Sequence, residues 1–238
     1  MTVVKHNILN DIAVIEISNP PVNAISAAVR IELLETVNKL SVEKNIKAVV
    51  ITAPERTFLA GADIKEFGKD TDAPNLSEIC DKIENLDKIV VASLHGTPLG
   101  GGLEVAMSAH YRIAAPKTKV GLPEVLLGIL PGAGGTQRLP RLCGVSMALD
   151  MMLTGKHVPA EEAFANGIID EIALNDKTVE NGISYAQKLI SESFEVRPTS
   201  KITSKVNNLE EIKEIITNAK ANALKKYKNL FSPHNIIK

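Results

Sequence analysis

The chain has 238 residues, 45% of them hydrophobic, and its 27 Lys+Arg against 28 Asp+Glu leave a formal net charge of −1. That length makes one large domain or two small ones, able to fold without a disulfide or metal. The balanced charge argues against nucleic acid or a membrane surface as partner, and 3% aromatic residues argue against base-stacking platforms. No run approaches the roughly 18 apolar residues that span a bilayer. We therefore expect a globular protein with neither partner.

The cysteines and histidines show no ligand or redox spacing. Cys80 and Cys143 lie far apart without a CxxC motif, which indicates buried thiols and a reducing compartment. The N-terminus has no recognisable targeting segment, so a cytoplasmic location is expected, with a peroxisome or another organelle left open. The five histidines are scattered, and we expect no metal site.

The first half of the chain alternates between short apolar runs and helical patterns. Strands at 3–4 and 12–17 are predicted to be joined by a turn at 10–11. Ser26 is the predicted N-cap of a helix that extends to about Leu40. Further predicted elements follow in order: strands at 48–52, 89–94 and 111–114, and helices at 76–86 and 103–109. Such alternation predicts an α/β fold with a mainly parallel sheet.

The second half is richer in predicted helices. They are expected near residues 137–142, 146–153, 159–166 and 179–191, with a strand at 168–173. Beyond Phe194 the sequence turns polar, and 197–208 is predicted to be a linker. A lysine-rich amphipathic helix at 209–227 follows, and 231–234 is interpreted as a helix stop. We therefore predict a core domain at 1–195 and a linker with a C-terminal helix at 196–238.

A run of three glycines, Gly100 to Gly102, follows a predicted strand and opens a predicted helix. Glycines let the backbone approach another group closely, and the first N–H groups of a helix have no partner within it. These groups are suited to an oxyanion hole, although a tight strand–helix turn explains the glycines equally. Neither this run nor the glycine-rich stretch at 131–137 fits a dinucleotide or P-loop motif, so no nucleotide cofactor is expected.

Two carboxylates accompany the glycines. Glu104 is predicted in the first helical turn, where the helix start favours its ionised form, and Glu124 precedes an apolar segment that raises its pKa. Separated pKa values suit an acid/base pair. The structural alternatives are a dipole-complementing glutamate at Glu104 and a solvated loop charge at Glu124.

Four segments carry a resemblance to a known family: residues 19–24 (Asn-Pro-Pro-Val-Asn-Ala), 58–66, 100–104, and 120–124 through 131–138. In this order and spacing they resemble the enoyl-CoA hydratase/isomerase (crotonase) superfamily over about residues 2–190. The resemblance implies a spiral of ββα units with mainly parallel sheets, followed by C-terminal helices. It implies hydration of 2-trans-enoyl-CoA in fatty-acid β-oxidation. An enoyl-CoA isomerase and a non-catalytic acyl-CoA-binding scaffold remain alternatives.

The resemblance also implies roles for individual residues. The N–H groups of Ala62 and Gly101 correspond to the oxyanion hole, and Glu104 and Glu124 to the two hydratase glutamates. Gly132 corresponds to a glycine whose N–H holds the water or the thioester. Coenzyme A, which is part of the substrate and not a separate cofactor, is expected along Ala24, Ala60, Asp63 and Ile64. For Asp63, a cap on the following helix is the structural alternative.

Within the superfamily, residues 19–26, 110–114, 121–125 and 139–142 are similar to the hydratase part of bifunctional enoyl-CoA hydratase/3-hydroxyacyl-CoA dehydrogenases. The sequence after Phe194 departs from single-function hydratases, which usually complete a trimer with their last helices. We therefore expect an acyl-CoA thioester as substrate. The expected protein partner is either a second copy of the chain or a fused or associated 3-hydroxyacyl-CoA dehydrogenase.

Overall fold

The computed structural model describes residues 2–54 and 56–238. Its main sheet has six strands, in the order β1 (Val4–Leu9), β2 (Ile12–Ile17), β3 (Ala48–Thr52), β4 (Ile89–Leu94), β5 (Tyr111–Ala114) and β8 (Glu171–Ile172). β1 and β2 form an antiparallel hairpin, and every other neighbouring pair is parallel. The predicted α/β fold with a mainly parallel sheet is confirmed.

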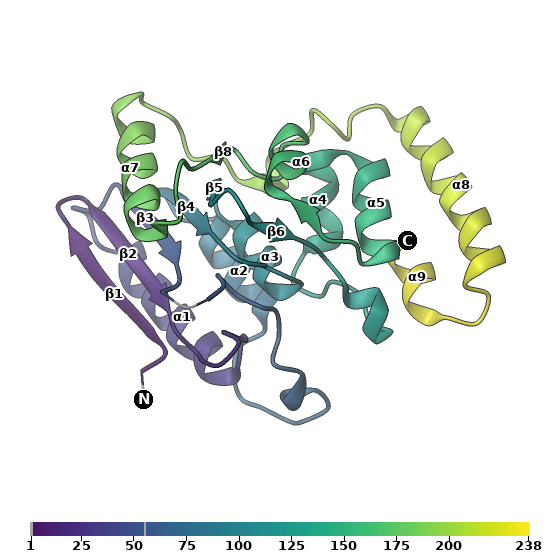
Figure 1. Ribbon diagram of the computed structural model, residues 1–238, viewed down its shortest axis with the longest axis horizontal. Helices are drawn as coiled ribbons and strands as arrows, with labels where there is room; N and C mark the ends of the chain where they lie inside the picture. The colour runs from purple at the N-terminus through teal and green to yellow at the C-terminus, as the bar shows by residue number, and fades with distance from the viewer. Residues whose placement is uncertain (1, 55) are drawn as a thin grey trace.

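Helices cover the two faces of this sheet (Figure 1). On one face, Val50 and Val91 pack against Leu189 of α7 (Thr178–Ser191). On the other, Val49 and Ile51 belong to the large core shared with α1 (Ala27–Ser41), α2 (Leu76–Glu84) and α3 (Gly101–Ser108). Being covered on both sides explains why β3 and β4 are continuous apolar runs instead of alternating patterns.

The predicted first helix is found with its predicted cap. The Ser26 hydroxyl accepts a hydrogen bond from the Val29 N–H at 3.4 Å, which satisfies one unpaired donor of α1. Val29, Leu33, Val37 and Leu40 are fully or almost fully buried, as their three- and four-residue spacing predicts.

The helices of the middle of the chain form a second group beside the sheet. They are α4 (Gly135–Cys143), α5 (Val145–Thr154) and α6 (Ala160–Ala165), with the antiparallel pair β6 (Lys119–Val120) and β7 (Val158–Pro159) next to them. Within residues 2–54 and 56–238 there are also three short 3-10 turns: η1 (Ile64–Glu66), η2 (Glu124–Leu127) and η3 (Thr199–Lys201). The predicted strand at 168–173 is shorter than expected, because only Glu171–Ile172 pairs with β5.

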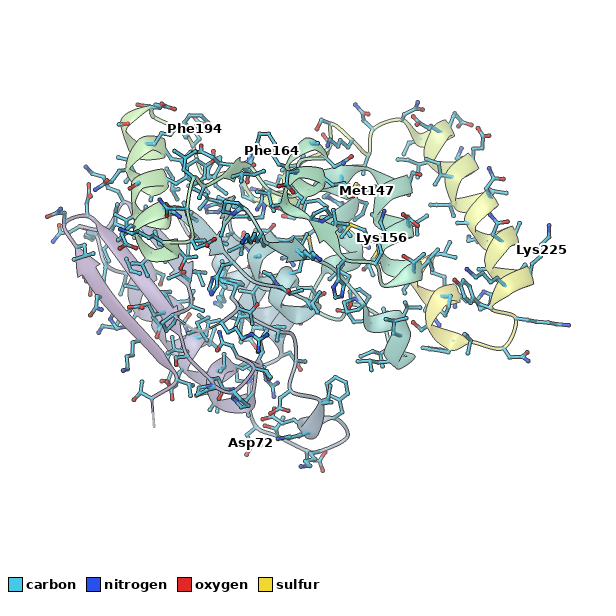
Figure 2. All side chains as sticks on the ribbon, in the orientation of Figure 1. Asp72, Met147, Lys156, Phe164, Phe194 and Lys225 are labelled. Atoms are coloured by element: carbon cyan, nitrogen blue, oxygen red, sulfur yellow. The ribbon has the colours of Figure 1, made fainter. Side chains whose placement is uncertain are left out.

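Two C-terminal helices, α8 (Leu209–Lys226) and α9 (Phe231–Ile236), lie at the end of the molecule opposite β1 and β2 (Figure 1). The prediction of a helix stop at 231–234 is wrong. α9 begins at Phe231, and Pro233 occupies its first turn, where the missing N–H of proline costs no helical hydrogen bond. Lys225 extends from α8 away from the rest of the protein (Figure 2).

The C-terminal segment packs on the rest of the chain. Ala223, Ile236 and Ile237 are buried in the main core, and the Ser232 hydroxyl donates to the carbonyl of Ile129. Thr199, inside the predicted linker, is also buried. The boundary between residues 195 and 196 therefore stays a prediction about domain organisation, while the contacts across it are extensive.

Over the described residues, no helix is long and apolar enough to cross a membrane, and no group of His, Cys, Asp and Glu has metal-site geometry. Cys80 and Cys143 are buried free thiols, as predicted from their spacing.

Candidate active site

A cavity of about 590 Å³ lies where the loop after β3, the start of α3 and η2 meet. All five residues predicted to be catalytic line it: Ala62, Gly101, Glu104, Glu124 and Gly132. They come from three separate parts of the sequence, which the fold brings to one place. A larger hollow, of about 800 Å³, opens among residues 41–47, 87–89 and 190–196, and no predicted site residue lines it.

The pairing of Ala62 directs its N–H away from the neighbouring segment. Ile25 forms a parallel bridge with Ala62, but it bonds to the residues on either side: its N–H donates to Gly61 at 2.8 Å, and its carbonyl accepts from Asp63 at 3.2 Å. In this pattern the N–H of the middle residue faces the opposite side. In the part of the chain that the structure describes, this N–H has no protein acceptor, which leaves it available to a ligand in the cavity.

The second predicted donor, Gly101, is the first residue of α3, so its N–H has no acceptor within the helix. A Cβ atom added at Gly101 would lie 3.7 Å from the Ala62 nitrogen and 2.8 Å from Leu76 Cδ2. The absence of a side chain therefore lets the two backbone segments approach each other. Both residues line the cavity, as the predicted oxyanion hole requires.

The flanking glycines have steric reasons of their own. Gly100 has φ +51°, and a Cβ there would lie 3.0 Å from Oε1 of Glu124. A Cβ on Gly102 would come within 2.1 Å of the Leu59 carbonyl oxygen. The tight strand–helix turn, one of the two alternatives at the sequence level, is present, and the oxyanion hole stays a prediction for the same residues.

Glu104 is buried and held by a loop that the sequence did not connect to it. Its Oε1 accepts hydrogen bonds from the N–H of Ala133 at 2.7 Å and of Gly135 at 2.8 Å. Burial raises the pKa of Glu104 above its usual value, while the two N–H donors and Arg138 oppose this rise. The expectation that the helix start favours the ionised form of Glu104 is therefore wrong: burial is the largest influence on its pKa, and the donors that oppose it come from Ala133 and from Gly135, the first residue of α4.

Glu124 begins η2 and is only 8% exposed, so its interpretation as a solvated loop charge is wrong. Among the described residues its Oε2 has no hydrogen-bond partner. Burial, helped by the nearby charge of Glu104, raises the pKa of Glu124 to about 7. Near neutral pH the cavity therefore contains one carboxyl group that is readily protonated beside another that two N–H donors stabilise as a carboxylate.

The structure separates the four residues expected along coenzyme A. Ala60 and Ile64 line the cavity, whereas Ala24 and Asp63 do not. Oδ1 of Asp63 accepts from the Lys65 N–H at 3.0 Å, so this residue caps η1, as its structural alternative predicted. The carbonyl of Ala24 accepts from the Asn19 side chain at 2.7 Å.

Sequence reasoning missed a buried asparagine that supports the site. The Asn23 side-chain amide donates to the carbonyls of Ile17 and Phe58, and the backbone carbonyl of Asn23 accepts from the Ala60 N–H at 3.1 Å. Asn23 thereby fixes the segment that leads to Ala62. Asn23 has φ +57°, a conformation that asparagine tolerates better than most residues. An asparagine directly after Pro-Pro-Val is the sequence signal that could have indicated it.

The chain is similar to known proteins over most of its length. Residues 7–231 match the model of the family described as "Enoyl-CoA hydratase/isomerase". The chain belongs to the enoyl-CoA hydratase/isomerase family. The predicted family resemblance is thereby confirmed.

Curated relatives of the chain are similar over most of its length. A "Peroxisomal bifunctional enzyme" of Danio rerio is 44% identical over 193 residues, which cover 81% of this chain and 27% of that protein. A "Probable enoyl-CoA hydratase" of Bacillus subtilis (strain 168) is 39% identical over 74% of this chain and 73% of that protein. The chain thus spans about a quarter to a third of the multifunctional relatives that it matches.

Solved structures show the same fold over nearly the whole chain. An enoyl-CoA hydratase of Bacillus anthracis has a TM-score of 0.73 at 26% identity and covers 98% of this chain and 99% of its own. A Geobacillus kaustophilus structure titled as an enoyl-CoA hydratase has a TM-score of 0.74 at 29% identity, over 96% and 86% of the two chains. The predicted crotonase-like architecture with C-terminal helices is confirmed.

Proposed function

We propose that this chain catalyses the reversible hydration of 2-trans-enoyl-CoA to 3-hydroxyacyl-CoA in fatty-acid β-oxidation. One observation carries the proposal: two carboxyl groups with different environments, Glu104 and Glu124, face one cavity beside the N–H groups of Ala62 and Gly101. Relatives named as β-oxidation multifunctional proteins and enoyl-CoA hydratases support the same reaction.

The thioester carbonyl oxygen is placed against Ala62 and Gly101. Attack of water on the β-carbon pushes electron density through the conjugated system onto that oxygen, and the product of this step is an enolate. Two fixed N–H dipoles stabilise the new charge without reorganising, and each such donor contributes about 3–4 kcal/mol to transition-state stabilisation. Donors of this kind act more strongly on the enolate than on the neutral thioester, which is the requirement for catalysis.

The two glutamates then divide the proton transfers. The Glu104 carboxylate takes a proton from water as its oxygen bonds to the β-carbon, and the Glu124 carboxyl group gives its proton to the α-carbon. Water is added in total, and the proton gained by Glu104 returns to Glu124 through solvent before the next turnover. The N–H of Gly132, at the cavity wall, is proposed to hold the water or the thioester.

The substrate supplies its own coenzyme A, so the proposed reaction uses no separate cofactor. The part of coenzyme A next to the thioester is assigned to Ala60 and Ile64. The part farther from the thioester is assigned to the surface at Ala24 and Asp63. The apolar wall formed by Leu76, Leu127 and Leu130 is assigned to the acyl chain. The proposed protein partner is a second copy of the chain or a fused or associated 3-hydroxyacyl-CoA dehydrogenase. The mass of the protein in solution tests whether two copies associate.

The compartment is proposed from the relatives. Several of them are named peroxisomal or glyoxysomal, which favours a peroxisome over the expected cytoplasmic location. Imaging the tagged natural protein beside a peroxisomal marker tests this assignment.

Isomerisation of 3-enoyl-CoA is a second candidate, favoured by the environment of Glu124. A carboxyl group with a pKa of about 7 accepts and returns a proton near neutral pH, as transfer between the α- and γ-carbons requires. Glu104→Gln separates the two reactions: 3-enoyl-CoA turnover that survives while hydration is lost shows that the site supports both.

The proposal is tested by steady-state hydration of a series of 2-trans-enoyl-CoA thioesters of increasing chain length, starting with crotonyl-CoA. Turnover of at least one member supports the assignment. Calorimetric binding of the thioesters without turnover of any of them would contradict the proposed hydratase activity and favour an acyl-CoA-binding scaffold.

A further inference from the structure

The guanidinium of Arg138 lies directly behind the loop that holds Glu104. Arg138 belongs to α4 and is only 4% exposed. Its Nη1 donates to the Ala133 carbonyl at 2.9 Å. The N–H of the same residue, Ala133, donates to Glu104 on the other side of the loop. A single residue therefore connects the arginine to the glutamate.

The loop follows the guanidinium closely. Gly134 has φ +97°, and a Cβ atom placed there would lie 2.3 Å from Nη1 of Arg138. The next residue, Gly135, supplies the second N–H to Glu104 at 2.8 Å. Both donors to the glutamate thus belong to the three residues, 133–135, that lie over the arginine.

A buried carboxylate fixes the arginine in turn. Glu84, in α2, is 3% exposed and accepts from Arg138 Nε at 3.2 Å and from Nη2 at 2.9 Å. Oε1 of Glu84 also accepts a hydrogen bond from the Ser200 N–H at 2.8 Å. At the surface, Asp81 accepts a hydrogen bond from Arg138 Nη2. A two-pronged contact of this kind fixes the plane of a guanidinium, and the single ammonium of lysine does not reproduce it.

We propose that Arg138, held by Glu84, is a positioning residue that fixes residues 133–135 so that the N–H groups of Ala133 and Gly135 converge on Glu104. The inference deepens the proposed function and rests on it, because it gives Glu104 the role of base. Arg138 lies outside the lining of the cavity and acts through the loop.

The arrangement has a consequence for the pH dependence of the reaction. The groups that face Glu104 are Glu124 from η2, Cys80 from α2 and Arg138 from α4. Of these, Cys80 is un-ionised, since burial raises the pKa of its thiol to about 12. If the loop relaxes, Glu104 keeps its burial but loses its two N–H donors, so its pKa rises. The acid limb of kcat/KM then moves to higher pH.

The test compares Arg138→Met, Arg138→Lys and the double variant Glu84→Gln/Arg138→Met with the wild type. The double variant leaves neither partner of the Arg138–Glu84 pair as an unpaired buried charge, so it keeps the fold where the single methionine variant loses it. The control is Arg141→Met, one turn further along α4, whose half-buried side chain donates to the carbonyls of Gln137 and Ser200 and makes no hydrogen bond to residues 133–135. The measurements are kcat/KM for crotonyl-CoA against pH, and hydrogen exchange of the 131–135 peptide.

We expect the double variant to lose about 10²-fold in kcat/KM, as for a displaced catalytic group, with its acid limb at higher pH and faster exchange of 131–135. Arg138→Lys keeps the positive charge but loses the two-pronged contact with Glu84, and it should change kcat/KM, the acid limb and the exchange rate in the same direction. Arg141→Met matches the wild type. The inference is overturned if Arg138→Lys or the double variant folds, exchanges hydrogen in the 131–135 peptide at the wild-type rate, and keeps the acid limb of kcat/KM at the wild-type pH. Absence of hydration by the wild type overturns the proposed function instead, and exchange of 131–135 still decides the positioning role.

Discussion

Two glutamates in one cavity differ because their surroundings differ. Glu104 receives two backbone N–H bonds, whereas Glu124 has an oxygen without a partner among the described residues. The sequence predicted both residues and the raised pKa of Glu124. It did not predict the donors to Glu104, because hydrogen bonds between residues about 30 positions apart depend on how α3 and α4 pack. The same reason hid Arg138 and Glu84, which resemble ordinary surface charges until their burial is known.

The raised pKa of Glu124 predicts a stability effect that depends on pH. The folded-state pKa of about 7 exceeds the ordinary value of 4.5, so ionisation of this group disfavours folding. Glu124→Gln, which mimics the neutral acid, should therefore increase the free energy of unfolding by about 3 kcal/mol above pH 7. This gain should shrink as the pH falls from 7 toward 4.5 and vanish below it, in denaturant titrations at several pH values. A gain that is the same at all pH values would contradict the assigned pKa.

The pair also predicts the pH profile of hydration. The active form has Glu104 ionised and Glu124 protonated, so the pair carries one proton. Hydration kcat/KM of the free enzyme should be bell-shaped, falling as the pH rises through about 7 and falling again where Glu104 becomes protonated. Initial rates over a pH series test this prediction. A profile that stays flat through pH 7 is incompatible with Glu124 as the proton donor.

Among the helices and strands, the start of α3 places several residues of the candidate site within one helical turn. Three glycines there allow close contacts with Leu59, Leu76 and Glu124, and the first residue of the helix, Gly101, lines the cavity. The sequence predicted this helix two residues too late, because glycine is a poor helix former and its presence argued for a turn. Packing against the loop after β3 overrides that preference.

A single added methyl group tests the closest of these contacts. Gly102→Ala places Cβ 2.1 Å from a backbone oxygen that cannot move without displacing the loop. We expect a loss of about 3 kcal/mol or more in unfolding free energy, or no folded protein. Gly132→Ala is the matched control for stability, because a Cβ there meets nothing within 4 Å. Equal melting temperatures of the two variants would show that the packing of α3 is looser than described.

For the whole molecule, the question is how the C-terminal segment relates to the rest. Balanced charge and low aromatic content predicted a globular chain without a nucleic-acid partner, and the motifs predicted a core up to about residue 195. Sequence alone did not place residues 196–238, because the pattern of a lysine-rich amphipathic helix is the same whether it packs on its own chain or on another. In the structure Ile236 and Ile237 lie in the main core, beyond a proline that was interpreted as a stop.

That packing predicts a measurable contribution from the last residues. Ile237 is 3% exposed, so Ile237→Ala should cost roughly 2–5 kcal/mol of unfolding free energy in chemical denaturation. Leu224→Ala is the control on α8, since this side chain is 61% exposed and should change stability by less than about 0.5 kcal/mol. Equal, small effects of both substitutions would mean that the segment does not stabilise the core.

The central claim is that Glu124 supplies the proton in hydration of an enoyl-CoA. Its most direct test is the turnover of crotonyl-CoA by Glu124→Gln, measured together with thermal unfolding of the same preparation. We predict a roughly 10²–10⁴-fold loss of kcat in a variant that unfolds at or above the wild-type temperature. Near-wild-type turnover in that folded variant would contradict it.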